Sequence, residues 1–171
     1  MIALDPTSFD QLYQRRFAEL RGLAQRVVGD GGEAEEVVQE AFVRLNDAGP
    51  RDRPDSEQAA WLRRVCLNLA FNRARDERRA RERLERAARL EPEHAVEGPE
   101  REVTRTEEAA AVRRALATLP DRQRECLLLR HSGYSYAEIA ATLEIAVGSV
   151  GVLLARGERA FREAYLEREN G

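Results

Sequence analysis

The sequence predicts an all-helical protein of two small domains joined by an acidic, flexible linker. Apolar residues recur at the three-to-four-residue spacing of amphipathic helices, and no useful stretch of strand-like alternation appears. Charge is laid out in blocks: residues 61–83 hold eight arginines against three acidic residues, whereas residues 85–108 hold four arginines against eight glutamates. We therefore expect an N-terminal domain at 5–84, a linker at 85–107 and a C-terminal domain containing a helix-turn-helix at 108–167.

The N-terminal domain is expected to contain three helices. Its first apolar stripe runs from Phe9 to Val27 and ends at the glycines of residues 29–32, which are typical of a helix end. A second stripe occupies residues 34–45. The loop at 46–58 interrupts the pattern with glycine and proline, and a third helix is predicted to start near Ser56.

The third predicted helix begins with apolar residues and ends rich in arginine. Trp61, Leu62, Val65 and Leu69 recur in phase, which places them in the core. The continuation at residues 71–87 has almost no apolar stripe. A helix that is polar all round and rich in arginine is either solvated or laid along phosphates. Taken alone, a run of charges is more often a solvated face.

Residues 85–108 have the composition of a linker. They contain proline and glycine at positions 92, 98 and 99, few apolar residues and a surplus of glutamate. Such a segment cannot bury enough apolar surface to offset the entropy of ordering it. We expect it to be partly disordered.

The segment from Ser135 to Val150 has the pattern of two short helices joined by a tight turn. Ser135 and Glu138 form an S-x-x-E capping box, which satisfies free amides at a helix start. Apolar residues follow at the spacing that packs one short helix on the next: Ile139, Ala140, Leu143, Ile145, Val150 and Leu154. A helix-turn-helix of this kind places its second helix in the DNA major groove. An ordinary helical hairpin is the alternative interpretation of this segment.

Composition argues against several classes of protein. All 28 basic residues are arginine, which we attribute to genome composition, and the net charge of −3 restricts any nucleic-acid surface to a local patch. Cys66 and Cys126 lie in separate apolar runs, as expected for reduced core thiols. No Cys/His cluster suits a metal, no cofactor is expected, and no grouped carboxylates or histidines indicate an enzyme. Without a signal peptide or an apolar run of transmembrane length, we expect a soluble, cytoplasmic protein with no membrane insertion.

Three stretches carry a resemblance to a known family: AEEVVQEAF at 34–42, WLRRVCLNLAFNRARDERR at 61–79 and ALATLPDRQRECLLLRHSGYSYAEIAATLEIAVGSV at 115–150. Together they resemble the bacterial extracytoplasmic-function (ECF) sigma factors, the smallest two-domain sigma subunits of RNA polymerase. The resemblance implies a protein that docks on core RNA polymerase, recognises and melts promoter DNA and initiates transcription, with an anti-sigma factor as a further partner. A helix-turn-helix repressor or activator that acts without polymerase is the alternative function.

The resemblance also implies where each partner binds. The polar face of the second helix, with Glu36, Gln39 and Glu40, corresponds to the surface that docks on polymerase; without the resemblance, a solvated face is the simpler interpretation. Residues implied at the −10 element lie on the third helix and are Arg63, Arg64, Asn68, Asn72, Arg75, Arg78 and Arg79. Residues implied at the −35 element are Arg124, Ser135, Tyr136, Ser149, Arg156 and Arg159. Arginines suit DNA phosphates, and asparagine amides suit base edges.

The predicted recognition helix departs from the family pattern. Gly151, Val152, Leu153 and Ala155 occupy positions where family members usually display polar side chains, and Glu144 replaces a frequent turn glycine. Such a helix has few groups that contact a base edge through two hydrogen bonds, so discrimination at the −35 element should be weak or should use thymine methyl groups. Alternatively, the apolar face binds a protein such as an anti-sigma factor. The residues leave both interpretations open.

Overall fold

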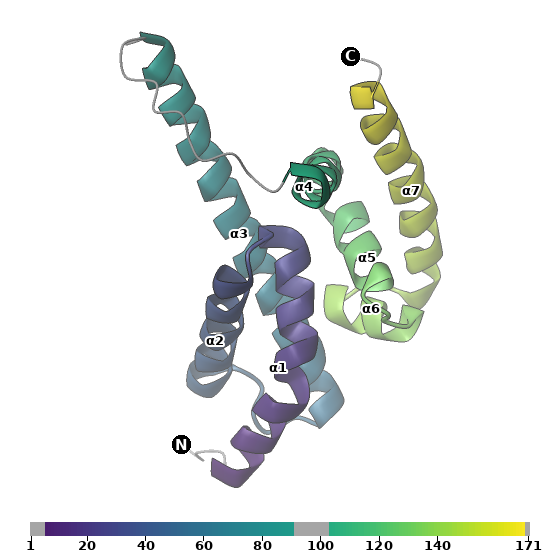
Figure 1. Cartoon of the computed structure of the whole chain (residues 1–171). Helices are drawn as coiled ribbons and strands as arrows, with labels where there is room; N and C mark the ends of the chain where they lie inside the picture. The colour runs from purple at the N-terminus through teal and green to yellow at the C-terminus, as the bar shows by residue number, and fades with distance from the viewer. Residues whose placement is uncertain (1–5, 91–102, 170–171) are drawn as a thin grey trace.

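The computed structural model describes residues 6–90 and 103–169, which form seven helices and no strand (Figure 1). The all-helical fold predicted from the sequence is confirmed. One bundle contains α1, α2 and α3, and a second group of helices packs beside α1 and α3. The helices are α1 (Pro6–Val28), α2 (Gly31–Ala48), α3 (Asp55–Leu90), α4 (Val103–Ala117), α5 (Asp121–His131), α6 (Tyr136–Leu143) and α7 (Val147–Glu169).

The predicted apolar stripes build the core of the N-terminal bundle. Leu20 and Leu23 of α1, Phe42 of α2 and Leu62 of α3 are almost completely buried. Trp61 is partly buried and packs against this core, as its phase with the other apolar residues predicts. The stripe on each helix therefore faces the other two helices, and among the described residues of this bundle the charged side chains are at least partly exposed, apart from Arg63.

Short polar contacts define where helices begin and end. Asp30 caps α2 by accepting a hydrogen bond from the Glu33 amide at 2.9 Å. The predicted capping box of α6 is confirmed: the Ser135 amide donates to the Glu138 carboxylate at 2.8 Å, and the Glu138 amide donates to the Ser135 hydroxyl at 3.2 Å. At the other end of α6, Glu144 adopts the left-handed conformation, with φ +55°.

α3 continues past the predicted end of the N-terminal domain. The sequence places that end at residue 84 and a flexible linker from 85, but the chain remains helical to Leu90. Every side chain from 81 to 90 is exposed, so tertiary packing does not stabilise this end. Arginine–glutamate pairs one turn apart do so instead, at Arg81–Glu77 (3.0 Å), Arg78–Glu82 (3.8 Å) and Arg86–Glu82 (3.9 Å). The middle of the expected linker, 91–102, lies outside the described residues.

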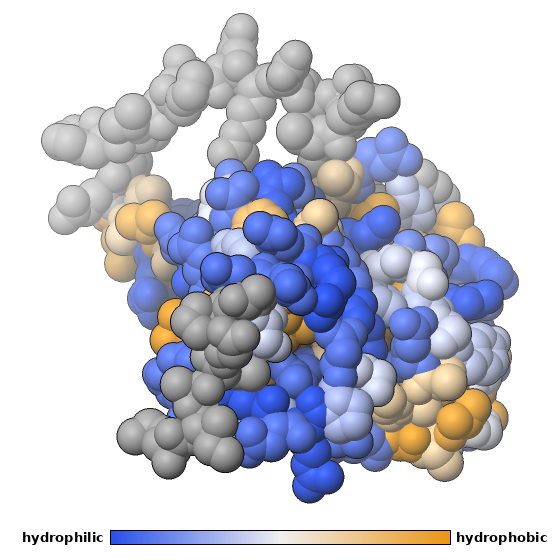
Figure 2. All heavy atoms as spheres, turned by 90° about the horizontal axis from the view of Figure 1, so that it is seen from below, coloured by the Kyte–Doolittle hydropathy of each residue, from blue (hydrophilic) through white to orange (hydrophobic). Residues whose placement is uncertain are grey.

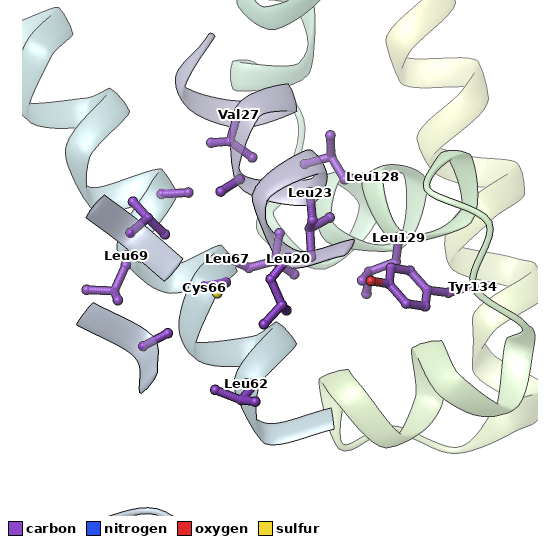
Figure 3. Packing of buried hydrophobic residues seen from close by; sticks show 14 of the residues in the cluster. Leu20, Leu23, Val27, Leu62, Cys66, Leu67, Leu69, Leu128, Leu129 and Tyr134 are labelled. Atoms are coloured by element: carbon purple, nitrogen blue, oxygen red, sulfur yellow. The ribbon is translucent and has the colours of Figure 1, made fainter. Parts of the chain in front are cut away.

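The two groups of helices share one buried apolar cluster (Figure 3). It includes Leu23 of α1, Leu67 of α3, and Leu128 and Leu129 of α5. The sequence predicts two domains but not how they pack on each other. Here α3 contacts α6, and α1 contacts α5, so the helix-turn-helix lies against the arginine-bearing helix.

The described residues contain neither a membrane-spanning helix nor a metal site. No single helix in these ranges is long and apolar enough to cross a bilayer, and the α6–α7 pair approaches that composition only across a bend of 95°. No three His, Cys, Asp or Glu side chains in the same ranges are grouped to hold a metal ion. Cys66 and Cys126 are buried free thiols, and burial raises their pKa values to about 12 and about 11.

Candidate nucleic-acid and polymerase interfaces

Arg63, which the resemblance implies at the −10 element, is buried where the two groups of helices, the N-terminal and C-terminal domains, meet. Its side chain is only 4% exposed. The guanidinium Nε donates a hydrogen bond to Oγ1 of Thr142 in α6 at 3.0 Å. Nη1 lies 3.4 Å from a carboxylate oxygen of Glu19 in α1, and the guanidinium carbon lies 4.7 Å from the centre of the Tyr134 ring. In this arrangement Arg63 connects the domains and is not open to DNA.

Tyr134 completes this contact, which we call the interdomain cluster (Glu19, Arg63, Tyr134 and Thr142). Its hydroxyl donates to Oε1 of Glu19 at 2.7 Å, and burial together with this hydrogen bond raises its pKa. Figure 3 shows the ring reaching toward the N-terminal bundle. Neither Glu19 nor Thr142 is predicted as a site residue from the sequence. The one signal for Thr142 is a polar residue in a helix whose other inward residues are apolar.

Arg64, the next residue implied at the −10 element, also has a partner in the other domain. Its Nη1 lies 2.6 Å from a carboxylate oxygen of Glu144. The left-handed conformation of Glu144 costs a non-glycine residue about 1–2 kcal/mol. A glycine would remove that cost, but it could not form the ion pair. The unusual glutamate in the turn thus has an interdomain contact that glycine would lack.

The remaining residues implied at the −10 element lie along the exposed side of α3. Asn68, Asn72, Arg75, Arg78 and Arg79 are all exposed. Arg75 donates to the Asn72 amide oxygen at 3.2 Å. Because these groups follow one another along a single helix, they form a continuous polar row that begins beside the interdomain contact.

The three residues implied in polymerase docking lie together on the outer side of α2. Glu36 and Gln39 are exposed and Glu40 is half-buried. Glu36 pairs with Arg73 of α3 at 2.7 Å, and Glu40 pairs with Arg44 at 2.6 Å. Hydrogen bonding to Glu36 raises the pKa of Arg73. The carboxylates are therefore held in place by arginines of this chain while the side of α2 remains accessible.

The residues implied at the −35 element separate into two groups. Ser135 and Tyr136 lie at the start of α6, while Ser149, Arg156 and Arg159 are exposed along α7. Arg124 differs from them, because it faces the N-terminal domain. Its guanidinium lies 3.9 Å from the centre of the Phe71 ring of α3, and it pairs with Asp121 at 2.8 Å.

The start of α7 exposes apolar side chains. Val147 is 53% exposed and Val152 is 51% exposed, with Gly148 and Ala155 also at the surface. Leu153, in contrast, is half-buried and packs against the core. Figure 2 shows a largely hydrophilic face of the molecule with small, separate hydrophobic areas. The helix that would enter the groove therefore offers few hydrogen-bond donors at its first turns.

A helical bundle with an exposed arginine-rich helix, beside a helix-turn-helix, is an arrangement typical of DNA-binding proteins. Two family models match the chain in these two parts. The model described as Sigma-70 region 2 covers residues 12–80, and the model described as Sigma-70, region 4 covers residues 109–161.

Relatives of known identity agree with these matches. The chain is 34% identical over 168 residues to the RNA polymerase sigma-H factor of Pseudomonas aeruginosa, covering 94% of this chain and 87% of that protein. It is 31% identical over 156 residues to the ECF RNA polymerase sigma factor SigM of Mycobacterium tuberculosis, covering 91% and 76%. This chain belongs to the ECF group of RNA polymerase sigma factors. It is a factor for promoter recognition, promoter melting and transcription initiation.

Two solved structures have a similar arrangement. CnrH in complex with the cytosolic domain of CnrY is 27% identical, with a TM-score of 0.61 over 96% of this chain and 91% of that one. The sigma factor RpoE from Bartonella quintana, in complex with the anti-sigma factor NepR, has a TM-score of 0.59 at 21% identity over 92% and 96%. The second likeness concerns the fold alone.

Proposed function

We propose that α3 binds the −10 element, that α6 and α7 bind the −35 element, and that the outer side of α2 docks on core RNA polymerase. The observation that supports this assignment best is the continuous exposed row from Asn68 to Arg79 on α3. Arginines in such a row can follow a phosphate backbone, and the asparagine amides between them can contact unstacked bases.

The proposed activity is binding and not catalysis. Promoter strands separate because the protein binds one melted strand more tightly than it binds the duplex, and the surplus binding free energy offsets unpairing. This work requires no cofactor from the protein. Binding of the melted strand requires cationic side chains along the DNA backbone and polar side chains that contact the bases. We propose that α3 provides both. Since its partners are the polymerase and the promoter, we place this activity in the cytoplasm.

We infer that the described arrangement is a resting form. Arg63 and Arg64 hold partners within the chain, Thr142 and Glu144, at 3.0 Å and 2.6 Å. Each would have to leave its partner before it could contact DNA. The helix-turn-helix would therefore separate from α3 when the protein engages polymerase and promoter, and the binding free energy of those partners would drive the separation.

We infer that an anti-sigma factor is a further partner. The structurally similar sigma factor RpoE is bound to one in its solved structure. In this chain, the exposed valines at the start of α7 provide an apolar surface that either a protein or thymine methyl groups could cover.

Run-off transcription tests the proposed function. Core polymerase is incubated with genomic promoter fragments with and without this protein, and transcripts are mapped. We expect discrete promoter-specific transcripts only when the protein is present. A protein that binds the same fragments but yields no transcript with core polymerase would instead act as a helix-turn-helix repressor or activator.

A further inference from the structure

A second cluster of arginines surrounds a cavity between the domains, further along α3 than the interdomain cluster. The cavity has a volume of about 540 Å³ and is lined by seven arginines but only two acidic residues. The arginines come from both domains, from α1 and α3 on one side and from α4 and α5 on the other. Like charges repel, so gathering these guanidinium groups costs free energy that an opposite charge in the cavity would offset.

The two acidic residues of the lining do not neutralise this cluster. Asp121 pairs with Arg124 at 2.8 Å, and Glu77 pairs with Arg81 at 3.0 Å. Within residues 6–90 and 103–169, the arginines at positions 26, 75, 113 and 114 form no ion pair with a carboxylate. The cavity therefore retains a surplus of positive charge.

The pKa of Arg124 reflects this surplus of positive charge. Burial lowers the pKa of its guanidinium, and the nearby charges of Arg75 and Arg78 lower it further, whereas Asp121 and Glu125 act in the opposite direction. Its Nε is also buried and has no hydrogen-bond partner. An anion in the cavity would relieve this repulsion.

The shape of the cavity limits what that anion can be. A volume of a few hundred cubic ångströms is typical of small-molecule sites and excludes a DNA duplex, which is about 20 Å wide. Besides the arginines, the walls include apolar side chains such as Val28, Phe71 and Leu116. A ligand with several phosphates would pair with the arginines, and a flat base on the same ligand would pack against the apolar wall.

We propose that this cavity binds a nucleoside oligophosphate, whose phosphates contact arginines from both domains. Arg75 and Arg78 of α3 hold it from one side, and Arg113 and Arg114 of α4 from the other. The Arg113 guanidinium lies against Gly29, directly after α1, where a Cβ would be 2.7 Å from the guanidinium carbon. The ligand joins the domains, so it binds the resting form and stabilises it by mass action.

A consequence for regulation rests on the proposed function. Arg75 and Arg78 are also implied at the −10 element, so one arginine cannot serve the oligophosphate and promoter DNA at the same time. A ligand that binds only the resting form therefore reduces promoter opening in proportion to its occupancy.

Binding is tested on the full chain without polymerase or promoter, so that its outcome is independent of the proposed function. Isothermal titration calorimetry is performed with ATP, with inorganic tripolyphosphate and with sulfate at matched ionic strength. We expect one ATP per chain, weaker binding of tripolyphosphate, which lacks the base, and no saturable binding of sulfate. Absence of saturable ATP binding overturns the proposal.

Matched variants locate the site. Arg114→Gln in α4 and Arg78→Gln in α3 should each weaken ATP binding about tenfold or more, as expected for loss of a charged hydrogen bond. The control is Arg86→Gln, which changes an exposed arginine of the same helix outside the cavity and should leave affinity unchanged. If Arg78→Gln weakens binding but Arg114→Gln does not, the anion lies on α3 alone. If all three variants weaken binding equally, ATP is attracted nonspecifically by the positive charge of the chain. Either of these two results refutes a site between the domains.

Discussion

Arg63 of α3 and Thr142 of α6 are hydrogen-bonded across 3.0 Å although 79 positions separate them in the chain. The bond joins a residue implied in −10 binding to the helix-turn-helix that is implied in −35 binding. On the proposed assignment of the −10 residues, this arrangement covers part of the DNA-binding surface of α3 with the helix-turn-helix. On that assignment, we expect this contact to break when the chain binds a promoter.

The first prediction concerns that bond. Thr142→Val removes the acceptor and leaves Nε of Arg63 buried without a partner, which costs about 1–3 kcal/mol. Because Arg63 regains water only when the domains separate, we expect the variant to shift toward an open form. Small-angle scattering should then show a larger radius of gyration. Thr118→Val is the control, since Thr118 lies directly after α4 and its hydroxyl donates to the nearby Ala115 carbonyl at 2.7 Å, not across the domains. An unchanged radius for Thr142→Val would contradict the prediction.

The second prediction separates the two roles of Glu144. Glu144→Gly removes about 1 kcal/mol of backbone strain in the turn and also removes the ion pair with Arg64. Glu144→Gln retains the strain and removes only the charge. Both variants should weaken the domain contact slightly, as expected for a partly exposed pair. Only the glycine variant should slow amide hydrogen exchange at the end of α6. Equal exchange in both variants would show that the conformation of Glu144 is not strained.

The third prediction concerns the arginine row of α3. Replacing Arg75, Arg78 and Arg79 together by Ala should weaken open-complex formation and flatten its dependence on salt, because fewer counterions are released from the DNA. Binding to core polymerase should persist. A matched triple variant at Arg83, Arg86 and Arg89 removes equal charge from the exposed end of the same helix and serves as the control. If promoter opening is unchanged at several salt concentrations, Arg75, Arg78 and Arg79 are solvated and do not contact the DNA.

The fourth prediction concerns the recognition helix α7. Arg156→Ala and Arg159→Ala should weaken all promoters about equally, because this helix has few groups that contact base edges. Substituting single −35 bases should cost less than the ~1–3 kcal/mol of a lost bidentate contact. Binding is measured with a panel of −35 sequences. A steep penalty at one base, abolished by one of these arginine substitutions, would demonstrate direct base recognition.

The fifth prediction concerns the buried thiols. Burial raises the pKa of Cys66 to about 12 and of Cys126 to about 11, so both remain protonated at pH 8. Since the thiolate is the reactive form, alkylation should be slow in the native protein. Unfolding in urea restores the ordinary pKa, and both thiols should then react rapidly. The measurement is mass spectrometry after timed iodoacetamide treatment; rapid native modification of Cys66 would contradict its position in the core.

The sequence by itself determined the helices and the turn of the C-terminal domain, because their causes are local. Apolar residues at helical spacing predict which side of each helix is buried, and the capping box needs only Ser135 and Glu138, three positions apart. Local information also placed the end of the N-terminal domain at residue 84, because the low apolar content at 85–90 indicated a linker, whereas α3 remains helical to Leu90. The arginine–glutamate pairs that extend the helix to Leu90 were a local signal too, but a weaker one.

Only the tertiary structure decided which arginines are free. Arg63 and Arg79 are both arginines of one helix, yet the first is buried against Glu19, Tyr134 and Thr142 and the second is exposed. Those three partners lie 44, 71 and 79 positions away from Arg63 along the chain, so neither spacing nor composition could identify them. The cavity arginines likewise meet only because the tertiary fold brings residues of α3 and α4 to the walls of one cavity. Helical periodicity depends on neighbours in sequence, whereas burial and ion pairing depend on neighbours in space.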